Sequence, residues 1–145
     1  MCPENWVSYN DSCYQFNFGS SQQLSWSAAK SACNSTGGSS SLVTIKSKEE
    51  QDFITKQVQA FSKSEVWIGL SDIGSETTFK WDDGSSLTDT KFAMWANGKP
   101  TENKEDKDCV LMIGSRIDGA WSVQSCTLKR NFICIRHRGQ CFILL

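Results

Sequence analysis

The stretch that decides the fold of this chain is VWIGL at residues 66–70, followed by TFKWDDGS at residues 78–85. β-Branched and aromatic residues dominate the first segment and the first four residues of the second, so both are predicted as short strands. Residues 82–108 are then polar and irregular, with two glycines and a proline as breakers. Strands are predicted again at residues 109–113 and 131–136. A loop as long as this one is uncommon inside a domain and tends to be functional.

Two helices are predicted before these strands. Apolar residues at helical spacing predict a helix over residues 26–33, with Ser25 as its N-cap. Ser47 and Glu50 form a capping box, in which each side chain accepts the other's backbone N–H, and the apolar stripe behind it predicts a helix of about 14 residues. Residues 13–16 alternate like a short strand. The fold class is therefore α+β, with two helices, short antiparallel strands and one long loop.

Length and charge exclude several classes of protein. The chain has 145 residues, which suits a single domain, and its 15 basic and 16 acidic residues argue against a nucleic-acid-binding or polybasic membrane protein. Its longest apolar run, residues 141–145, is far shorter than the roughly 20 residues that span a bilayer, and no signal segment follows Met1. No nucleophile and orienting group accompany the one histidine, His137, so no enzymatic activity is expected.

Cysteine is the strongest compositional signal. The seven cysteines form no Cys-x-x-Cys pair, and such a dense set without zinc spacing indicates disulfides formed in an oxidising compartment. Sequons at Asn10 and Asn34 agree with a secreted glycoprotein. We therefore expect an extracellular piece of a longer protein, with Met1 added for expression. The cysteines are Cys2, Cys13, Cys33, Cys109, Cys126, Cys134 and Cys141.

These features together resemble the long form of the C-type lectin-like domain. The resemblance covers nearly the whole chain and is carried by WIGL at residues 67–70 and FKWDDGS at residues 79–85. It implies a single domain over residues 1–136 and a C-terminal linker or artificial tail over residues 137–145. Further markers of the family, in order along the chain, are Trp6, Cys13, Tyr14, Trp26, Cys33, Leu42, Ile45, Trp95, Pro100, Cys109, Trp121, Cys126 and Cys134.

The resemblance also implies which cysteines pair. Spacing alone leaves 15 ways to pair six cysteines. The family pattern selects the disulfides Cys2–Cys13, Cys33–Cys134 and Cys109–Cys126, and it leaves the pairing of Cys141 open. The same resemblance places the six tryptophans in the core and assigns Asp82-Asp83-Gly84 to a turn after a strand. His137 is expected beyond the last strand, as an exposed residue.

Sugar-binding members of this family hold a calcium ion in the long loop, and that ion ligates sugar hydroxyls. Their Glu-Pro-Asn or Gln-Pro-Asp motif aligns with KPT at residues 99–101, so an ammonium group replaces an oxygen ligand. Their Trp-Asn-Asp triplet aligns with WSV at residues 121–123, which lacks both the amide and the carboxylate. Calcium takes six to eight oxygen ligands. No calcium is therefore expected at the primary sugar site, and no other cofactor is expected.

The long loop nevertheless remains the predicted ligand-binding face, because loops on a rigid scaffold commonly carry recognition. Its acidic residues either hold calcium in a displaced or structural site, or form a solvated loop whose charge Lys104 and Lys107 partly cancel. The sequence favours the solvated loop. The candidate ligand-binding residues are Lys99, Pro100, Thr101, Glu102, Asn103, Glu105, Asp106, Asp108 and Ser122.

The resemblance implies an extracellular recognition domain of a cell-surface receptor, with a protein as the expected ligand. Natural-killer-cell receptors and several domains of the mannose-receptor family resemble it in having lost calcium ligands. One alternative is a carbohydrate-binding lectin that uses a displaced calcium or calcium-independent contacts. Another is a structural module that spaces other domains of a receptor and binds nothing. No nucleic-acid partner is expected, and a membrane is expected only through a parent chain.

Overall fold

The computed structural model describes residues 2–61, 64–74, 78–98 and 108–137. It contains both helices and strands, and the predicted α+β class is confirmed. In chain order the elements are β1 (Val7–Tyr9), β2 (Ser12–Asn17), α1 (Trp26–Asn34), β3 (Ser41–Leu42), α2 (Lys48–Phe61), β4 (Glu65–Ser71), β5 (Lys80–Trp81), α3 (Leu87–Thr90), the 3-10 helix η1 (Ala96–Gly98), β6 (Cys109–Ile113), β7 (Trp121–Gln124) and β8 (Asn131–His137).

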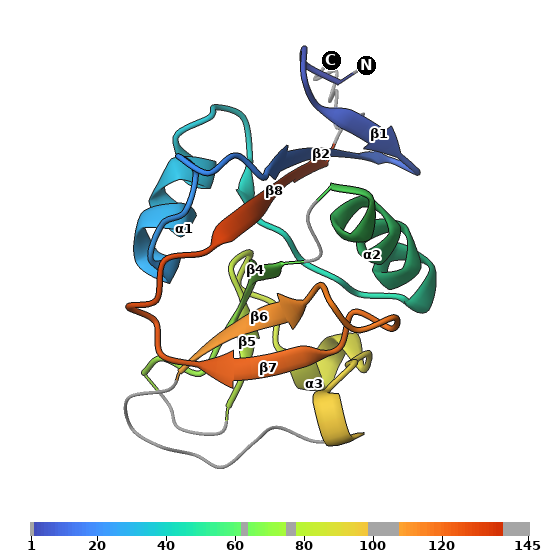
Figure 1. Cartoon of the computed structure of the whole chain (residues 1–145), viewed down its shortest axis with the longest axis vertical. Helices are drawn as coiled ribbons and strands as arrows, with labels where there is room; N and C mark the ends of the chain where they lie inside the picture. The colour runs from blue at the N-terminus through green and yellow to red at the C-terminus, as the bar shows by residue number, and fades with distance from the viewer. Residues whose placement is uncertain (1, 62–63, 75–77, 99–107, 138–145) are drawn as a thin grey trace, which may run out of the picture.

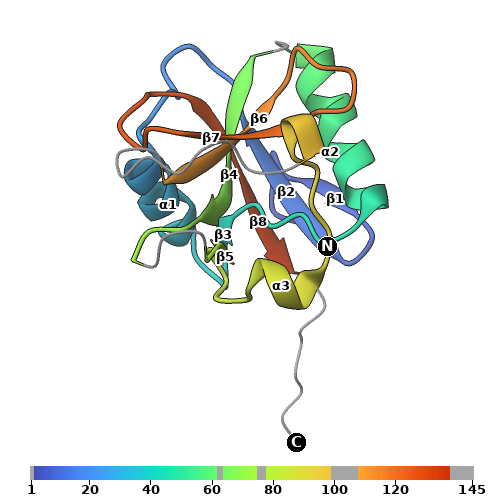
Figure 2. The same ribbon diagram turned by 90° about the horizontal axis from the view of Figure 1, so that it is seen from below.

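One sheet organises the molecule. Among the described residues its strands follow the order β1-β2-β8-β4-β6-β7, with β3 added to β8 and β5 added to β4. The last strand lies in the middle of this order and pairs with β4 in parallel, whereas the other named pairs are antiparallel as predicted. Helices α1 and α2 lie on opposite sides of the β2–β8 pair, in front view (Figure 1) and from below (Figure 2).

Helix α1 forms where the sequence predicts it. Its buried residues Trp26, Ala29 and Cys33 share one face, and the Ser25 hydroxyl accepts the Ala28 N–H as the N-cap. The Trp26 indole N–H donates to the carbonyl of Ile68 in β4 at 2.9 Å. Local spacing and one long-range hydrogen bond therefore fix the helix against the sheet.

Helix α2 has the predicted length but not the predicted cap. The Glu50 N–H donates to the Ser47 hydroxyl at 3.1 Å, as expected. The Glu50 carboxylate instead accepts the Lys46 N–H at 2.9 Å and the Tyr14 hydroxyl at 2.5 Å. The reciprocal half of the predicted capping box was wrong, because the buried Tyr14 hydroxyl needs an acceptor and Glu50 supplies it. Burial and then Glu50 raise the pKa of Tyr14 well above its usual value.

The core of β4 depends on a close backbone contact at Gly69. Its N–H donates to the Val43 carbonyl at 2.8 Å, and a Cβ at this position would lie 2.7 Å from the carbonyl oxygen of Leu42. Strand β5 is shorter than predicted, because it pairs only with Leu70 and Ser71 at the end of β4. The glycine of the WIGL segment is therefore required by packing of one backbone on another.

Three disulfides connect the elements, and their pairs are those that the resemblance implies. They are Cys2–Cys13 at the first hairpin, Cys33–Cys134 between α1 and β8, and Cys109–Cys126 at the start of β6. Cys141 lies outside the described residues.

The core and the last strand differ from the sequence prediction in detail. Four tryptophans are buried, whereas Trp6 and Trp95 are partly exposed at the edge of the core. His137 is exposed as expected, but it is the last residue of β8 and its Nδ1 lies 3.0 Å from the Ser12 hydroxyl. It belongs to the strand because it continues the β2 pairing opposite Ser12. No helix in the described ranges has the length and apolar character needed to cross a membrane.

Candidate functional site

The long loop joins β5 to β6, and its first half, residues 82–98, follows a defined path. The Gly84 N–H donates to the Trp81 carbonyl at 2.9 Å, and Gly84 has a φ of 94°, so the turn is the glycine-dependent one expected. Helix α3 then begins behind Ser86, whose hydroxyl accepts the Asp89 N–H at 3.0 Å. The prediction of a wholly irregular loop was wrong here. Segments as short as α3 and η1 carry too few residues for a periodic signal.

An aromatic cluster anchors this half of the loop to the sheet. The ring centroids of Trp81, Phe92 and Trp95 lie 5.5, 5.9 and 5.7 Å from the Trp121 ring, each edge to face. The backbone N–H of Trp121 donates to the Met94 carbonyl at 2.7 Å. Buried aromatic packing therefore holds residues 92–95 on the first residue of β7.

Helix α2 also supports the same tryptophan. The Trp121 indole N–H donates to the Gln51 side-chain oxygen at 3.0 Å. The Gln51 side-chain nitrogen donates to the carbonyls of Asp118 and Gly119 at 2.8 and 2.9 Å. The indole can only donate and the carbonyls can only accept, so this network fixes the orientation of the buried amide.

The other end of the loop is held by a disulfide and a backbone contact. Cys109, the first residue of β6, is bonded to Cys126. The Asp108 carbonyl accepts the Asp72 N–H at 3.0 Å, which connects the loop end to the end of β4. Both ends of the predicted recognition loop are thus fixed to a rigid frame.

The β7 side chains do not fit a calcium ion of the kind that sugar-binding relatives hold. Ser122 is 9% exposed, and its hydroxyl accepts the Gln124 side-chain N–H at 2.9 Å. Val123 is buried and carries no side-chain oxygen. The two positions matched to an amide and a carboxylate therefore supply one neutral oxygen, which is already hydrogen-bonded, whereas calcium needs several, some of them charged.

Most of the predicted binding residues lie outside the described part of the chain. Of the candidate set, Asp108 and Ser122 are described: Asp108 directly precedes β6, and Ser122 is the second residue of β7, opposite Leu111 in β6. Among the described residues, no group of three or more His, Cys, Asp and Glu side chains is arranged to hold a metal ion. The candidates outside the described residues are Lys99, Pro100, Thr101, Glu102, Asn103, Glu105 and Asp106.

Asp83, at the start of the loop, forms an ion pair with Lys46. Its carboxylate accepts the Lys46 ammonium at 2.6 Å and the Ser85 hydroxyl at 2.6 Å. Partial burial tends to raise the pKa of Asp83, but the hydrogen bonds from Lys46 and Ser85 outweigh it and hold that pKa below its usual value. The pair connects the turn after β5 to the segment that precedes α2.

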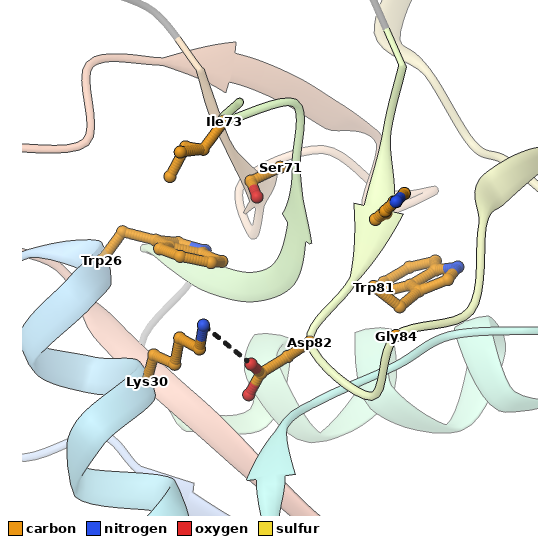
Figure 3. A pocket seen from close by; sticks show the side chains of 8 residues that line it. Trp26, Lys30, Ser71, Ile73, Trp81, Asp82 and Gly84 are labelled. Atoms are coloured by element: carbon orange, nitrogen blue, oxygen red, sulfur yellow. Dashed lines mark ion pairs between the residues drawn. The ribbon is translucent and has the colours of Figure 1, made fainter. Parts of the chain in front are cut away.

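The sequence did not reveal a pocket between α1 and the end of β5, which we call the α1–β5 pocket (Figure 3). It has a cavity volume of about 310 Å³. Lys30 comes from α1, whereas Lys80 and Asp82 flank Trp81 at the end of β5, and no motif links these two segments. The lining includes the side chains of Trp26, Lys30, Ile73, Lys80, Trp81 and Asp82.

The two predicted glycosylation residues are accessible. Asn10 lies in the turn between β1 and β2, Asn34 is the last residue of α1, and both are exposed. Modification of these residues stays a prediction that the exposure permits.

Comparison with known proteins identifies the family. The model of the C-type lectin domain matches residues 22–136. The human low affinity immunoglobulin epsilon Fc receptor is 38% identical over 136 residues, which are 93% of this chain and 38% of that protein. Mouse CD209 antigen-like protein A is 37% identical over 140 residues, which are 97% of this chain and 54% of that protein. The chain thus spans about a third to a half of the length of these curated relatives.

Solved structures agree with the sequence comparison. The C-type carbohydrate-recognition domain of cow CD23, solved in the presence of a GlcNAc2Man3 oligosaccharide, superposes with a TM-score of 0.79 at 33% identity. The match covers 94% of this chain and 96% of that one. The relatives named here are lectin and receptor domains. On the family match, the disulfides and the shared fold, this chain belongs to the C-type lectin domain family.

Proposed function

We propose that this chain is the extracellular recognition domain of a cell-surface receptor and that it binds a protein ligand without calcium at the primary sugar site. The proposal covers residues 1–136 as one domain, with residues 137–145 as a linker or tail. It places the ligand on the long-loop face, which comprises roughly residues 89–108 together with Ser122, and it assigns no catalytic role.

The observation that carries the proposal is the side-chain chemistry of β7. Ser122 and Val123 stand where sugar-binding members present an amide and a carboxylate, and the Ser122 hydroxyl is engaged with Gln124. In the sequence, Lys99 puts an ammonium at a third ligand position. A cation adjacent to this ammonium would be repelled rather than bound.

Two further features support an extracellular receptor domain. The three disulfides are typical of proteins that fold in an oxidising compartment. The human relative is named as a receptor for the Fc region of immunoglobulin epsilon, which is a protein ligand. A domain with this frame and without the calcium ligands is therefore suited to the recognition of a protein.

A carbohydrate-binding lectin is the second candidate. The structure of the related cow CD23 domain, described as a carbohydrate-recognition domain, favours it. Such a function here would need a displaced calcium or calcium-independent contacts, because β7 does not supply the primary ligands.

Calcium and glycan binding separate the two candidates. We expect millimolar calcium to leave the melting temperature unchanged, because a ligand stabilises a protein only when the folded state binds it. We also expect no signal on a glycan array, with or without chelator. A known calcium-dependent lectin domain serves as the positive control in both assays. A glycan signal that disappears with chelator would overturn the proposal.

The long-loop face is tested with a binding partner selected from an array of extracellular proteins. We expect alanine substitutions at Lys99, Glu102 and Asp106 to abolish the selected interaction, and chelator to leave it intact. Lys56→Ala, at an exposed lysine on α2, is the matched control. Binding that survives every loop substitution would argue against this face.

A further inference from the structure

The α1–β5 pocket is built by three separate segments. Trp26 and Lys30 project from α1, Ile73 follows β4, and Trp81 and Asp82 lie at the end of β5 (Figure 3). Its volume of about 310 Å³ lies at the lower end of the range of ligand pockets. It is therefore large enough for one or two side chains of a bound protein segment.

Asp82 forms the fixed floor of the pocket. Its side chain is 1% exposed, and one carboxylate oxygen accepts the Leu42 N–H at 2.8 Å. The other oxygen lies 3.6 Å from the Lys30 ammonium. Since both oxygens are engaged and covered, an incoming ligand meets the lysines and not this carboxylate.

The two lysines give the pocket a positive charge. Lys30 stays 46% exposed beside Asp82, and its ammonium lies 5.8 Å from the centre of the Trp26 ring. An ammonium has three donors, and these contacts leave donors available. Lys80 is exposed and forms no ion pair with the residues that the structure describes. With one carboxylate against two ammonium groups, the lining retains a net charge of +1.

The apolar part of the lining favours a protein over a sugar. Ile73 is 55% exposed, so a large aliphatic side chain lies open to solvent at the pocket. The two indole rings are closed by packing, with Trp26 5% exposed and Trp81 2% exposed. A sugar that stacks needs an open aromatic face, whereas an aliphatic surface beside ammonium groups complements an apolar side chain next to a carboxylate.

We propose that the α1–β5 pocket binds an acidic segment of a protein partner, with carboxylates of that segment on Lys30 and on Lys80 and an aliphatic neighbour on Ile73. None of its lining residues belongs to the set proposed for the long-loop face. The proposal deepens the proposed function and rests on it in one respect, that the partner is a protein.

The test is a titration of the ¹⁵N-labelled domain with three probes, followed by NMR. The first probe is the capped peptide Leu-Glu-Glu-Leu, the second has Gln in place of both Glu residues, and the third is the acidic sugar N-acetylneuraminic acid. The indole N–H signals of Trp26 and Trp81 report on the pocket. That of Trp6, which does not line the pocket and lies beside Arg136, is the internal control.

Lysine variants then test whether the ammonium groups of Lys30 and Lys80 bind the acidic peptide. We expect Lys30→Gln and Lys80→Gln each to weaken binding of the acidic peptide roughly threefold and the double variant about tenfold. Lys56→Gln, the same change at an exposed lysine on α2, should leave binding unchanged. Lys30→Gln removes the ion pair with Asp82 and can destabilise the fold. Lys80 makes no ion pair with described residues, so Lys80→Gln tests the charge of the pocket without that effect.

Each outcome decides the inference. Saturable shifts with the acidic peptide alone, at the two pocket indoles and weakened by the lysine variants, would support it. Equal binding of the neutral peptide, tighter binding of the sugar or the absence of saturable shifts would overturn it. The calcium and glycan assays do not involve this pocket, so failure here leaves the proposed function standing.

Discussion

Replacing Gln51 with methionine should destabilise the frame of the long loop. Gln51 is fully buried and joins the Trp121 indole N–H to the Gly119 carbonyl. Methionine keeps a similar volume but has neither the donor nor the acceptor, so two buried polar groups lose their partner. Each costs about 1–3 kcal/mol, and we expect the free energy of unfolding to fall by about 4 kcal/mol.

Urea unfolding, followed by tryptophan fluorescence, measures this change. Gln57→Met is the matched control, because Gln57 lies half-buried on the same helix and its side chain forms no hydrogen bond with the described residues. It should change the free energy of unfolding by less than about 0.5 kcal/mol. A loss below about 1 kcal/mol in Gln51→Met would refute the assignment of these hydrogen bonds as the support of Trp121.

Three further changes test other parts of the fold. Gly69→Ala should lower the melting temperature strongly, because its Cβ would lie 2.7 Å from the Leu42 carbonyl oxygen. If this variant melted at the same temperature as the wild type in a thermal scan, the packing argument would be wrong. Lys46→Gln should raise the pKa of Asp83, measured by carbon NMR of the carboxyl group, because it removes the main partner of the charged form. Since that pKa is lowered in the fold, the pair stabilises at neutral pH, and this advantage should disappear as the pH falls below about 4; an unchanged carboxyl titration would contradict the pairing. Ser25→Ala should reduce the free energy of unfolding by about 1 kcal/mol in urea titrations, as expected for the loss of an N-cap, and no loss would exclude this role.

Features decided within one helical turn were predictable from the sequence. The spacing of Trp26, Ala29 and Cys33 gave α1 its buried face, and Ser25 gave it a cap. The partner of Glu50 was not predictable, because it depends on Tyr14 from a distant strand. The parallel pairing of β4 with β8 likewise depends on the order of strands in the sheet, which periodicity does not contain.

The candidate site divides in the same way. The missing calcium ligands could be identified by alignment of the residue types at positions 122 and 123. The α1–β5 pocket could not, because Lys30, Ile73 and Lys80 become neighbours only through the packing of α1 beside β4 and β5. Lysines and a lone isoleucine have no pattern that distinguishes them from an ordinary solvated surface.

The position of β8 has a practical consequence for handling the protein. His137 ends this strand opposite Ser12, close to the Cys2–Cys13 disulfide, while α3 and β7 occupy the other end of the molecule (Figure 1). An affinity tag or biotin attached next to His137 or to the Cys2–Cys13 hairpin would thus leave from the end remote from α3. A sensor chip loaded through such a tag would hold the domain by this end and leave the end that carries α3 and β7 facing the flowing analyte.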